Sequence, residues 1–494
     1  MASLKSLAKD TVIYGLSSIV GRFLNYLLVP LYTAKLTVES GGYGVITNVY
    51  SYTALLLVIL TYGMETTFFR FSNKEGENPK KVYSTILMSV GFTSLLFLAA
   101  VLLFLDPISN AIGYIKHPEY IGVMAAVVAM DAFQAIPFAY LRQMKKAIKF
   151  ASLKLLFIIL NIGLNLLYFV ALPALYKTYP EAVGLIYNPS IGVGYAFFLN
   201  LVCTTVIMLC LIPELRGFKY VFDKALLKRM LKYSLPILIL GIAGILNQTA
   251  DKILFPFLNK SADATSQLGI YGAASKIAMI MAMITQAFRY AYEPFVFSKS
   301  KDKNSRATYA LAMKYFLIFT LLAFLMVVGY MDIIKHIIAP GYWEGLKVVP
   351  IVMVAEIMMG VYFNLSFWYK LIDKTMWGAL FSGIGCAVLV AVNVIFVPKY
   401  GYMACAWGGV AGYGTAMLLS YIIGQKKYPI KYPMKSITTY VLISAAIFAI
   451  MQSITQLTPW LRISINTAMI AAFITYTLKT ENFPLKSILN RLKR

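Results

Sequence analysis

The sequence predicts an all-α, polytopic integral membrane protein with 14 transmembrane helices: two related six-helix bundles followed by two C-terminal helices. Three observations lead to this prediction. Fourteen apolar stretches are each long enough to cross a bilayer, which takes about 20 apolar residues. The loops between them are alternately rich and poor in Lys and Arg. The two halves of the chain also carry matching residues at a nearly constant offset.

Composition excludes a soluble protein. The chain is 60% hydrophobic and only 13% charged, whereas about a quarter of the residues of a soluble domain are charged. The net charge of +25 is typical of nucleic-acid partners, but no soluble basic domain is present to hold a duplex, so we expect none. The first apolar stretch is too long for a signal peptide and contains Arg22, which predicts a retained helix.

The charge distribution orients the predicted spans. Basic loops stay on the cytoplasmic side of a membrane. With the N-terminus inside, and with the first and last three positions of each span counted with the adjoining loop, cytoplasmic segments hold 32 of the 45 Lys and Arg, outer loops hold eight and the spans hold five. Both termini are therefore predicted to be cytoplasmic. The spans are expected at 11–33, 43–68, 83–105, 120–141, 152–172, 188–212, 234–258, 268–292, 309–330, 347–370, 377–397, 402–424, 436–454 and 461–478.

Cysteine and histidine usage gives no sign of a metal or a disulfide. All four cysteines fall within predicted spans, and no pair has the spacing of metal ligands. The two histidines lie far apart in outer loops. Because the loops are short, almost no room remains for an extramembrane catalytic domain. The sequence therefore predicts a protein that is not an enzyme and holds no resident cofactor.

An internal repeat relates the two halves. One such match means little, but seven in order indicate duplication. Each repeat holds six spans, so both have the same orientation, and parallel repeats are an architecture of secondary transporters with the substrate site between them. The matches at offset 228 are Tyr43-Gly44 with Tyr271-Gly272, Glu65 with Glu293, Arg142 with Lys370, Lys146 with Lys374 and Asn165 with Asn393; those at offset 226 are Gly15 with Gly241 and Pro30 with Pro256.

The repeat divides the chain into four parts. We expect an N-terminal lobe at 1–212, an amphipathic cytoplasmic linker at 213–232, a C-terminal lobe at 233–425, and spans 13 and 14 with a basic cytoplasmic tail at 426–494. In the linker, apolar and basic residues alternate at helical spacing, which predicts a helix lying on the inner leaflet. The apolar residues are Leu226, Leu227, Met230 and Leu231, and the basic ones are Lys224, Lys228, Arg229 and Lys232.

Five basic residues lie inside the predicted spans. A charge at the bilayer centre costs at least ~2.5–3.5 kcal/mol, so such side chains should face the protein interior, a partner or water. Lys252 and Lys314 lie near span ends, and their long side chains can reach the interface. Arg22, Lys276 and Arg289 lie deeper.

Polar stripes on spans 1, 7 and 8 predict a cationic cavity between the lobes. Residues three, four or seven apart share a helix face. Arg22 has no acid one turn away, so another helix or a ligand must meet its charge. Arg289 lies one turn before Glu293, and an internal ion pair between them stays an alternative. The stripes are Ser18, Arg22 and Asn25; Asn247, Gln248 and Asp251; and Gln286, Arg289 and Glu293.

Few acids are embedded in the membrane. Acids in transporters carry H⁺ or Na⁺ because neutralising them removes the penalty of crossing. They are equally able to serve as structural partners of buried Lys or Arg, and the sequence does not separate the two roles. The candidates for ion coupling are Glu65, Asp131, Asp251, Glu293 and Glu356.

Short motifs along the whole chain resemble the polysaccharide transporters of the multidrug/oligosaccharidyl-lipid/polysaccharide exporter superfamily. They are Tyr14-Gly15…Arg22…Pro30-Leu31-Tyr32, Tyr43-Gly44, the run from Tyr271 to Lys276, Tyr292-Glu293-Pro294, and Asn393…Pro398-Lys399-Tyr400-Gly401. The resemblance implies an O-antigen-type flippase that moves undecaprenyl-diphosphate-linked oligosaccharide from the inner to the outer leaflet by alternating access. The lipid II flippases are related, but more arginines are expected in their first two helices.

The resemblance also implies the site and its setting. Basic residues of the first and eighth helices in the family map onto Arg22 and onto Lys276 or Arg289, with Ser18, Asn25, Asn247, Gln248 and Gln286 completing the cavity. We expect a monomer in the bacterial cytoplasmic (inner) membrane, for cell-surface polysaccharide synthesis. Expected partners are the lipid-linked substrate, the bilayer, a polysaccharide polymerase and glycosyltransferases.

Two other functions remain as alternatives. A cation or drug antiporter of the same superfamily needs acids facing the cavity, whereas span 1 offers Arg22 and no acid. A membrane enzyme of polysaccharide synthesis usually places its catalytic residues on a large outer loop, and the outer loops here are short.

Overall fold

The computed structural model describes residues 26–217, 219–299, 305–372 and 374–481, and every regular element among them is helical. Eleven helical segments in these ranges are long and apolar enough to cross a membrane, and α11 is a shorter apolar helix. The prediction of an all-helical membrane protein is confirmed; the count of 14 spans stays a prediction.

Predicted spans 2 to 14 each fall on one helix or on consecutive helical elements. In the first half the elements are α2 (Leu28–Lys35), α3 (Gly42–Thr61), α4 (Met64–Ser72), α5 (Pro79–Leu103), α6 (Leu105–Ala111), α7 (Pro118–Gln143), α8 (Ala147–Leu166), the π-helix η1 (Leu167–Ala171), α9 (Leu172–Thr178), α10 (Pro180–Val183), η2 (Pro189–Ile191), α11 (Gly194–Cys210) and η3 (Ile212–Leu215). In the second half they are α12 (Lys224–Leu258), α13 (Ala264–Lys299), α14 (Ser305–Gly329), α15 (Met331–Ile334), η4 (Lys335–Ile337), η5 (Pro340–Val348), α16 (Val349–Leu365), α17 (Phe367–Leu371), α18 (Met376–Tyr400), α19 (Tyr402–Lys427), α20 (Met434–Ser453) and α21 (Pro459–Thr480).

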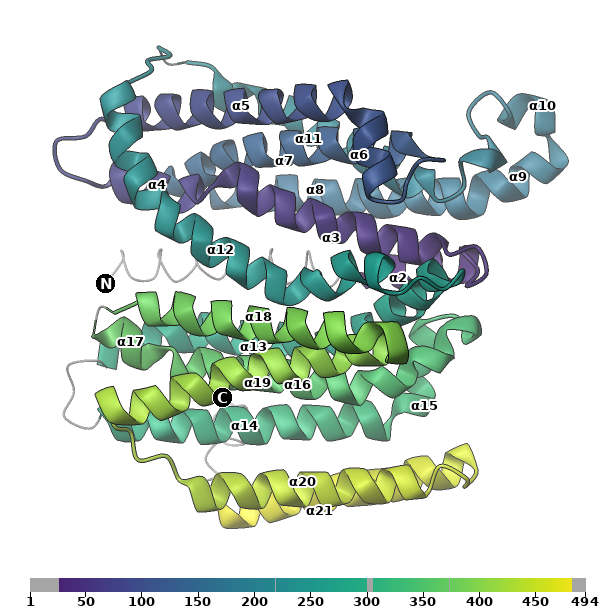
Figure 1. Ribbon diagram of the computed structural model, residues 1–494, viewed down its shortest axis with the longest axis vertical. Coiled ribbons are helices and arrows are strands. Elements are labelled where there is room, and N and C mark those ends of the chain that lie inside the picture. Colours follow the sequence, from purple (N-terminus) through teal and green to yellow (C-terminus); the bar gives the residue numbers. More distant parts are fainter. Residues whose placement is uncertain (1–25, 218, 300–304, 373, 482–494) are drawn as a thin grey trace, which may run out of the picture.

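The helices form two groups with a separate pair beside them (Figure 1). Helices α3 to α11 make the N-terminal lobe, and α13 to α19 make the C-terminal lobe. Helix α12 crosses from one lobe to the other. Helices α20 and α21 pack on α14 at the edge of the C-terminal lobe.

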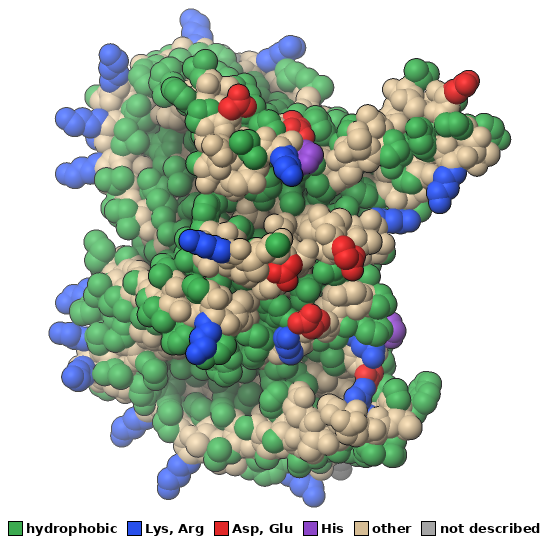
Figure 2. Space-filling view, turned by 45° about the vertical axis from the view of Figure 1, so that its right-hand side comes forward, with side chains coloured by type: hydrophobic (Ala, Val, Ile, Leu, Met, Phe, Trp, Pro, Cys, Tyr) green, Lys and Arg blue, Asp and Glu red, His purple; other side chains and the backbone are tan. Residues whose placement is uncertain are grey.

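Lys and Arg side chains gather at one end of the helices (Figure 2). This end, called the basic end, carries Lys80, Lys145, Lys224, Lys374 and Lys427, all in or beside loops that join neighbouring helices. The charge asymmetry that oriented the predicted spans is therefore a property of the folded molecule. That the basic end faces the cytoplasm stays a prediction.

The lobes share a core at the end opposite the basic end but have separate cores at the basic end. One apolar cluster unites Tyr43 and Phe197 of the N-terminal lobe with Leu268 and Tyr342 of the C-terminal lobe. At the basic end, Phe68 and its neighbours form one cluster, and Tyr292 and its neighbours form another. Among the described residues, the lobes thus share a core at one end only.

A glycine allows the close contact of the two lobes. A Cβ atom on Gly44 of α3 would lie 1.9 Å from the carbonyl oxygen of Thr265 in α13. Real side chains cannot occupy that space, so the backbones meet at this point. Any other residue at position 44 would push α3 and α13 apart.

The predicted linker helix forms the start of α12, and two of its apolar residues pack on protein; that the helix also lies on the inner leaflet stays a prediction. Asp223 caps its start by accepting a hydrogen bond from the amide of Leu226 at 2.9 Å. Leu226 and Met230 are fully buried against Phe68 and its neighbours in α4 and α5. An amphipathic pattern shows that one face is apolar but not whether lipid or protein covers it. The helix then continues without a break through span 7, with Pro236 inside it.

Candidate functional site

A cavity of about 470 Å³ lies between the two lobes. Its described lining comes from α3, α12, α13, α16, α18 and α19. Ligand pockets in proteins commonly measure about 300–1,000 Å³, so a diphosphate with part of a sugar headgroup has room here. The polar and charged lining residues are Tyr43, Thr47, Tyr50, Ser51, Asn247, Gln248, Thr249, Asp251, Lys252, Tyr271, Ser275, Lys276, Thr285, Gln286, Arg289, Glu356 and Tyr413.

All charges in the described lining come from the C-terminal lobe and from α12, which leads into it. Helix α3 of the N-terminal lobe contributes tyrosines, small polar residues and apolar residues. The three cations and two acids come from α12, α13 and α16, so the described wall has an excess of positive charge. They are Asp251, Lys252, Lys276, Arg289 and Glu356.

The structure brings most of the sequence-predicted residues together. Lys276, Arg289, Gln286, Asn247 and Gln248 all line the cavity. Ser18, Arg22 and Asn25 lie outside the described residues, as does the side chain of Glu293.

Two of these cavity residues have interactions that fix their place. The phenol of Tyr26, which lies within the first predicted span, donates to the backbone carbonyl of Lys276. The guanidinium of Arg289 lies 5.0 Å from the ring centroid of Phe363. A cation over an aromatic face is stabilised by the ring quadrupole.

Lys252 does not extend to the interface as its position near a span end had suggested. Its ammonium contacts both carboxylate oxygens of Asp251, at 2.9 and 3.0 Å, and donates to the backbone carbonyl of Gln248 at 3.0 Å. The phenol of Tyr271 donates to the same carboxylate at 2.7 Å. The sequence shows how far Lys252 lies from the end of its span. It does not show that polar groups of the cavity are close enough to hold the ammonium.

Glu356 is the second acid of the cavity. Its Oε2 atom is buried and has no hydrogen-bond partner in the described part of the chain. Lys252 is the cation that acts on it electrostatically. An unpaired carboxylate oxygen in a buried site is costly unless a cation or a proton neutralises it.

The two acids of the N-terminal lobe lie away from the described cavity lining. Glu65 accepts a hydrogen bond from Arg142 at 2.7 Å near the basic end. Asp131 accepts one from Thr204 at 3.4 Å and lies in the field of Lys154. Both therefore have partners within their own lobe.

Lys154 was not singled out from the sequence. Its ammonium lies 3.9 Å from the ring centroid of Phe138 in α7. The sequence could have indicated this lysine, because it lies two residues inside predicted span 5, and Asp131 lies in the preceding span.

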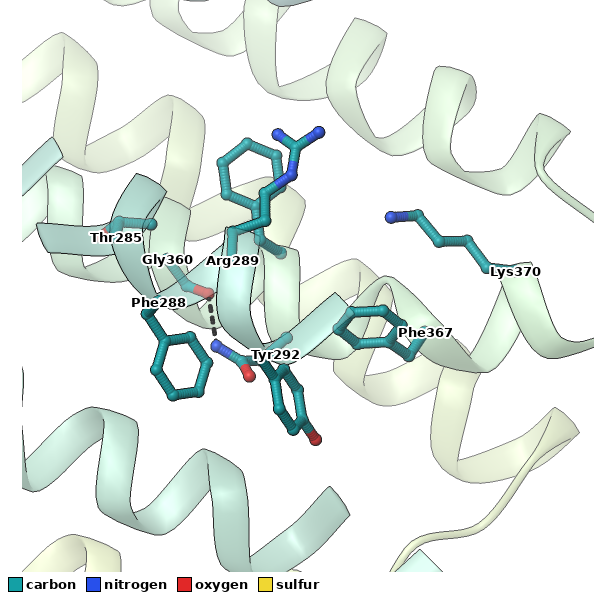
Figure 3. Close-up of a pocket in the computed structure, with 9 residues that line it drawn as sticks. Thr285, Phe288, Arg289, Tyr292, Gly360, Phe367 and Lys370 are labelled. Atoms are coloured by element: carbon teal, nitrogen blue, oxygen red, sulfur yellow. Dashed lines mark hydrogen bonds between the residues drawn. The ribbon is translucent and has the colours of Figure 1, made fainter. Parts of the chain in front are cut away.

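A smaller hollow near the basic end extends the site (Figure 3). Arg289 of α13 and Lys370 of α17 direct their charged groups into the same region. Aromatic rings of Phe288, Tyr292 and Phe367 line the rest. The sequence had named Lys370 only as the repeat partner of Arg142, so its position beside Arg289 is new.

The geometry favours some ligands over others. Cations grouped in a partly enclosed cavity suit an anionic group, and a guanidinium offers two parallel hydrogen bonds to phosphate oxygens. Carboxylates beside them suit a small cation. Among the described residues no group of three His, Cys, Asp or Glu could hold a metal ion.

Comparisons with known proteins agree with this architecture. The model of a family described as "Polysaccharide biosynthesis protein" matches residues 7–297. No curated protein sequence matches the chain.

Three solved structures illustrate the shared fold. The lipid II flippase MurJ in an inward closed conformation has a TM-score of 0.72 at 16% identity, covering 96% of this chain and 99% of that one. An inward-facing multidrug resistance transporter of the MATE family, in the MOP superfamily, has a TM-score of 0.64 at 15% identity, covering 82% and 93%. The MATE multidrug transporter DinF-BH has a TM-score of 0.61 at 15% identity, covering 85% and 96%.

Proposed function

Because this chain belongs to the polysaccharide biosynthesis protein family, we propose that it is a flippase for undecaprenyl-diphosphate-linked oligosaccharide. It moves this lipid from the inner to the outer leaflet by alternating access, as a step of cell-surface polysaccharide synthesis. It acts as a monomer in the bacterial cytoplasmic membrane with both termini in the cytoplasm. Glycosyltransferases supply its substrate, and a polysaccharide polymerase receives the product.

The observation that carries the proposal is the cationic cavity between the lobes. Lys252, Lys276 and Arg289 line it together. A diphosphate needs cationic donors in a low-dielectric site, because there each charge-assisted hydrogen bond gains strength. The polyprenyl tail stays in the lipid while the headgroup crosses through the cavity.

The packing of the lobes supports loading from the basic end. The lobes share one core at the opposite end, where Gly44 meets α13, and have separate cores at the basic end. Predicted topology places the basic end in the cytoplasm, where the substrate is made. Separation of the two lobes where Gly44 contacts α13 would release the headgroup on the outer side.

The acids of the cavity are the better candidates for coupling to H⁺ or Na⁺. Asp251 and Glu356 face the space that the headgroup would enter. Glu65 and Asp131 have partners inside the N-terminal lobe. We therefore assign coupling to the first pair and a structural role to the second.

Two alternatives use the same fold. A lipid II flippase would carry the same diphosphate with a different headgroup, and the likeness to MurJ at 16% identity shows the fold alone. A cation or drug antiporter would use the cavity acids, but three cations outnumber them in the described lining. The excess of positive charge favours an anionic substrate.

Transport in liposomes tests the proposal. Purified protein is reconstituted with a fluorescent lipid-linked oligosaccharide, and its arrival in the opposite leaflet is read by loss of fluorescence to an impermeant quencher. Lipid II and a cationic dye serve as parallel substrates. We expect relocation of the oligosaccharide lipid at unchanged mass. Relocation of only lipid II or only the dye would establish an alternative, and a change of mass would indicate an enzyme.

A further inference from the structure

Lys252 lines the cavity together with two acids, Asp251 and Glu356, and a second cation, Lys276. Its ammonium is held by the carboxylate of Asp251 at 2.9 Å. Because all four side chains line one cavity, the charge of Lys252 also acts on Glu356 and on Lys276.

The two acids are not equally satisfied. Asp251 has the ammonium of Lys252 and the phenol of Tyr271. Glu356 has a buried oxygen without any partner among the described residues. Movement of the Lys252 side chain away from Asp251 would leave both carboxylates short of positive charge in a site that water reaches poorly.

The opposite lobe holds the backbone at this residue. The side-chain amide of Asn48 in α3 donates to the backbone carbonyl of Lys252 at 2.8 Å. The main chain of Lys252 is therefore fixed at the contact of the two lobes, while its side chain reaches the cavity. A change at the ammonium occurs next to a bond that must break when the lobes separate there.

We propose that Lys252 couples the two ligands of the cavity, an anionic diphosphate headgroup and a small cation. In the empty cavity the ammonium neutralises Asp251 and offsets part of the charge of Glu356. A diphosphate between Lys252 and Lys276 draws the ammonium toward itself, because it relieves the repulsion between the two cations. The carboxylates then gain affinity for Na⁺ or H⁺. This inference rests on the proposed function and assigns a positioning residue within it.

Linkage makes the proposal measurable, because two ligands that affect one another do so by the same factor. Farnesyl diphosphate, a short prenyl diphosphate, serves as the anionic probe with protein in lipid nanodiscs. Binding of radioactive Na⁺ and uptake of protons from a weak buffer are measured with and without the probe. In the wild type we expect the probe to raise affinity for one of the two cations by about tenfold, within the usual range of such couplings.

The decisive variant is Lys252→Gln. Without the ammonium the carboxylates should bind the cation more tightly from the start, and the probe should no longer change that affinity. Lys260→Gln, the same change at an exposed lysine after α12, should behave as wild type. Lys252→Arg keeps the charge and should keep part of the coupling, which guards against a folding defect in the glutamine variant.

Two results would overturn the inference. One is a Lys252→Gln protein, monodisperse by size exclusion, whose cation affinity still rises tenfold with the probe. The other is a wild type that binds neither Na⁺ nor H⁺ more tightly when the probe is added. If that wild type still moves lipid-linked oligosaccharide in liposomes, the coupling role alone fails; if it moves none, the proposed function fails with it.

Discussion

Asn165 in the N-terminal lobe and Asn393 in the C-terminal lobe occupy matching positions of the repeat, and both are fully buried. Asn165 accepts a hydrogen bond from Tyr32 at 2.7 Å and donates to the backbone carbonyl of Asn161 at 2.8 Å. Neither polar side-chain atom of Asn393 has a partner in the part of the chain that the structure describes.

The repeat explains the difference. At the offsets of 226 and 228, the positions of Tyr32 and Asn161 correspond to Leu258 and Leu389. The second copy kept the amide but lost the hydroxyl of Tyr32 and the side-chain oxygen of Asn161, which accepts a hydrogen bond from Asn165 at 3.0 Å. An unsatisfied buried amide costs about 1–3 kcal/mol. The two lobes therefore share the repeat but differ in how much this buried asparagine contributes to stability.

The acids show the same divergence in a form that serves function. In the N-terminal lobe, Glu65 and Asp131 are engaged within the lobe. In the second half of the chain, Asp251 and Glu356 face the cavity together with every cation of its described lining. Among the described residues, the N-terminal lobe thus supplies a neutral wall of the cavity and the second half supplies its charges.

The largest expected effect comes from removing a cavity cation. Lys276→Gln should lower oligosaccharide transport by about 10- to 100-fold, because a hydrogen bond to a charged group contributes about 1.5–3 kcal/mol. Arg142→Gln, which removes a half-exposed cation of the N-terminal lobe, should stay within about twofold of wild type, because surface pairs contribute little. Transport is measured in liposomes at equal protein content. Equal losses in both variants would remove the functional distinction between the lobes.

The next effect concerns ion coupling. Glu356→Gln should abolish the dependence of transport on a Na⁺ or H⁺ gradient, because it removes an acid that faces the cavity. Asp131→Asn should leave that dependence unchanged, since Thr204 and Lys154 hold it within its lobe. Transport rates with and without each gradient decide. Gradient dependence that survives Glu356→Gln but is lost in Asp131→Asn would reverse the assignment.

A smaller effect tests the two asparagines. Asn165→Leu should lower the free energy of unfolding by about 1–3 kcal/mol, because the hydroxyl of Tyr32 loses its acceptor. Asn393→Leu should be neutral or stabilising, since it removes an amide that has no partner among the described residues. Thermal unfolding in detergent compares them. Equal destabilisation by both variants would show that Asn393 is satisfied after all.

The smallest effect concerns the start of α12. The ammonium of Lys81, 2.6 Å from Asp223, holds the pKa of that carboxyl below its ordinary value. A lowered pKa means that the stabilisation is fully present above the ordinary value and is lost as pH falls through the lowered one. Asp223→Asn should therefore reduce thermal stability slightly at pH 7 and remove this acid dependence. An unchanged acid profile would show that the pair contributes nothing.

Much of the fold was predictable because a bilayer imposes a minimum length on apolar spans and a bias on the charge of loops. Both features can be read directly from the sequence. Spans 2 to 14 each match one helix or consecutive helical elements for that reason. The covering of Leu226 and Met230 by protein was not predictable, because an amphipathic face does not identify what covers it. The surroundings of Lys252 were missed for a related reason, since Tyr271 of α13 and Glu356 of α16 join Asp251 and Lys252 of α12 only through helix packing.

The repeat shows the same limit in another form. Alignment of the two halves found Asn165 and Asn393 as a pair, yet it said nothing of their partners. Those depend on which side chains α2, α8, α12 and α18 bring alongside. Duplication preserves the position of a residue in the repeat, but only the structure shows which groups contact that residue.

Helix α12 has a mechanical consequence. It is a continuous helix of 35 residues, about 52 Å long at 1.5 Å per residue. Its first turns pack on the N-terminal lobe, and the rest contacts both α3 of that lobe and α18 and α19 of the C-terminal lobe. Rotation of one lobe relative to the other must therefore bend α12, and bending a helix stores elastic energy. Pro236 lacks the amide proton that a regular helix uses for its hydrogen bonds. Helix α12 should therefore bend easily just after the turns that pack on the N-terminal lobe. Pro256 interrupts the same hydrogen-bond pattern near the other end of the helix, so bending is expected at two places.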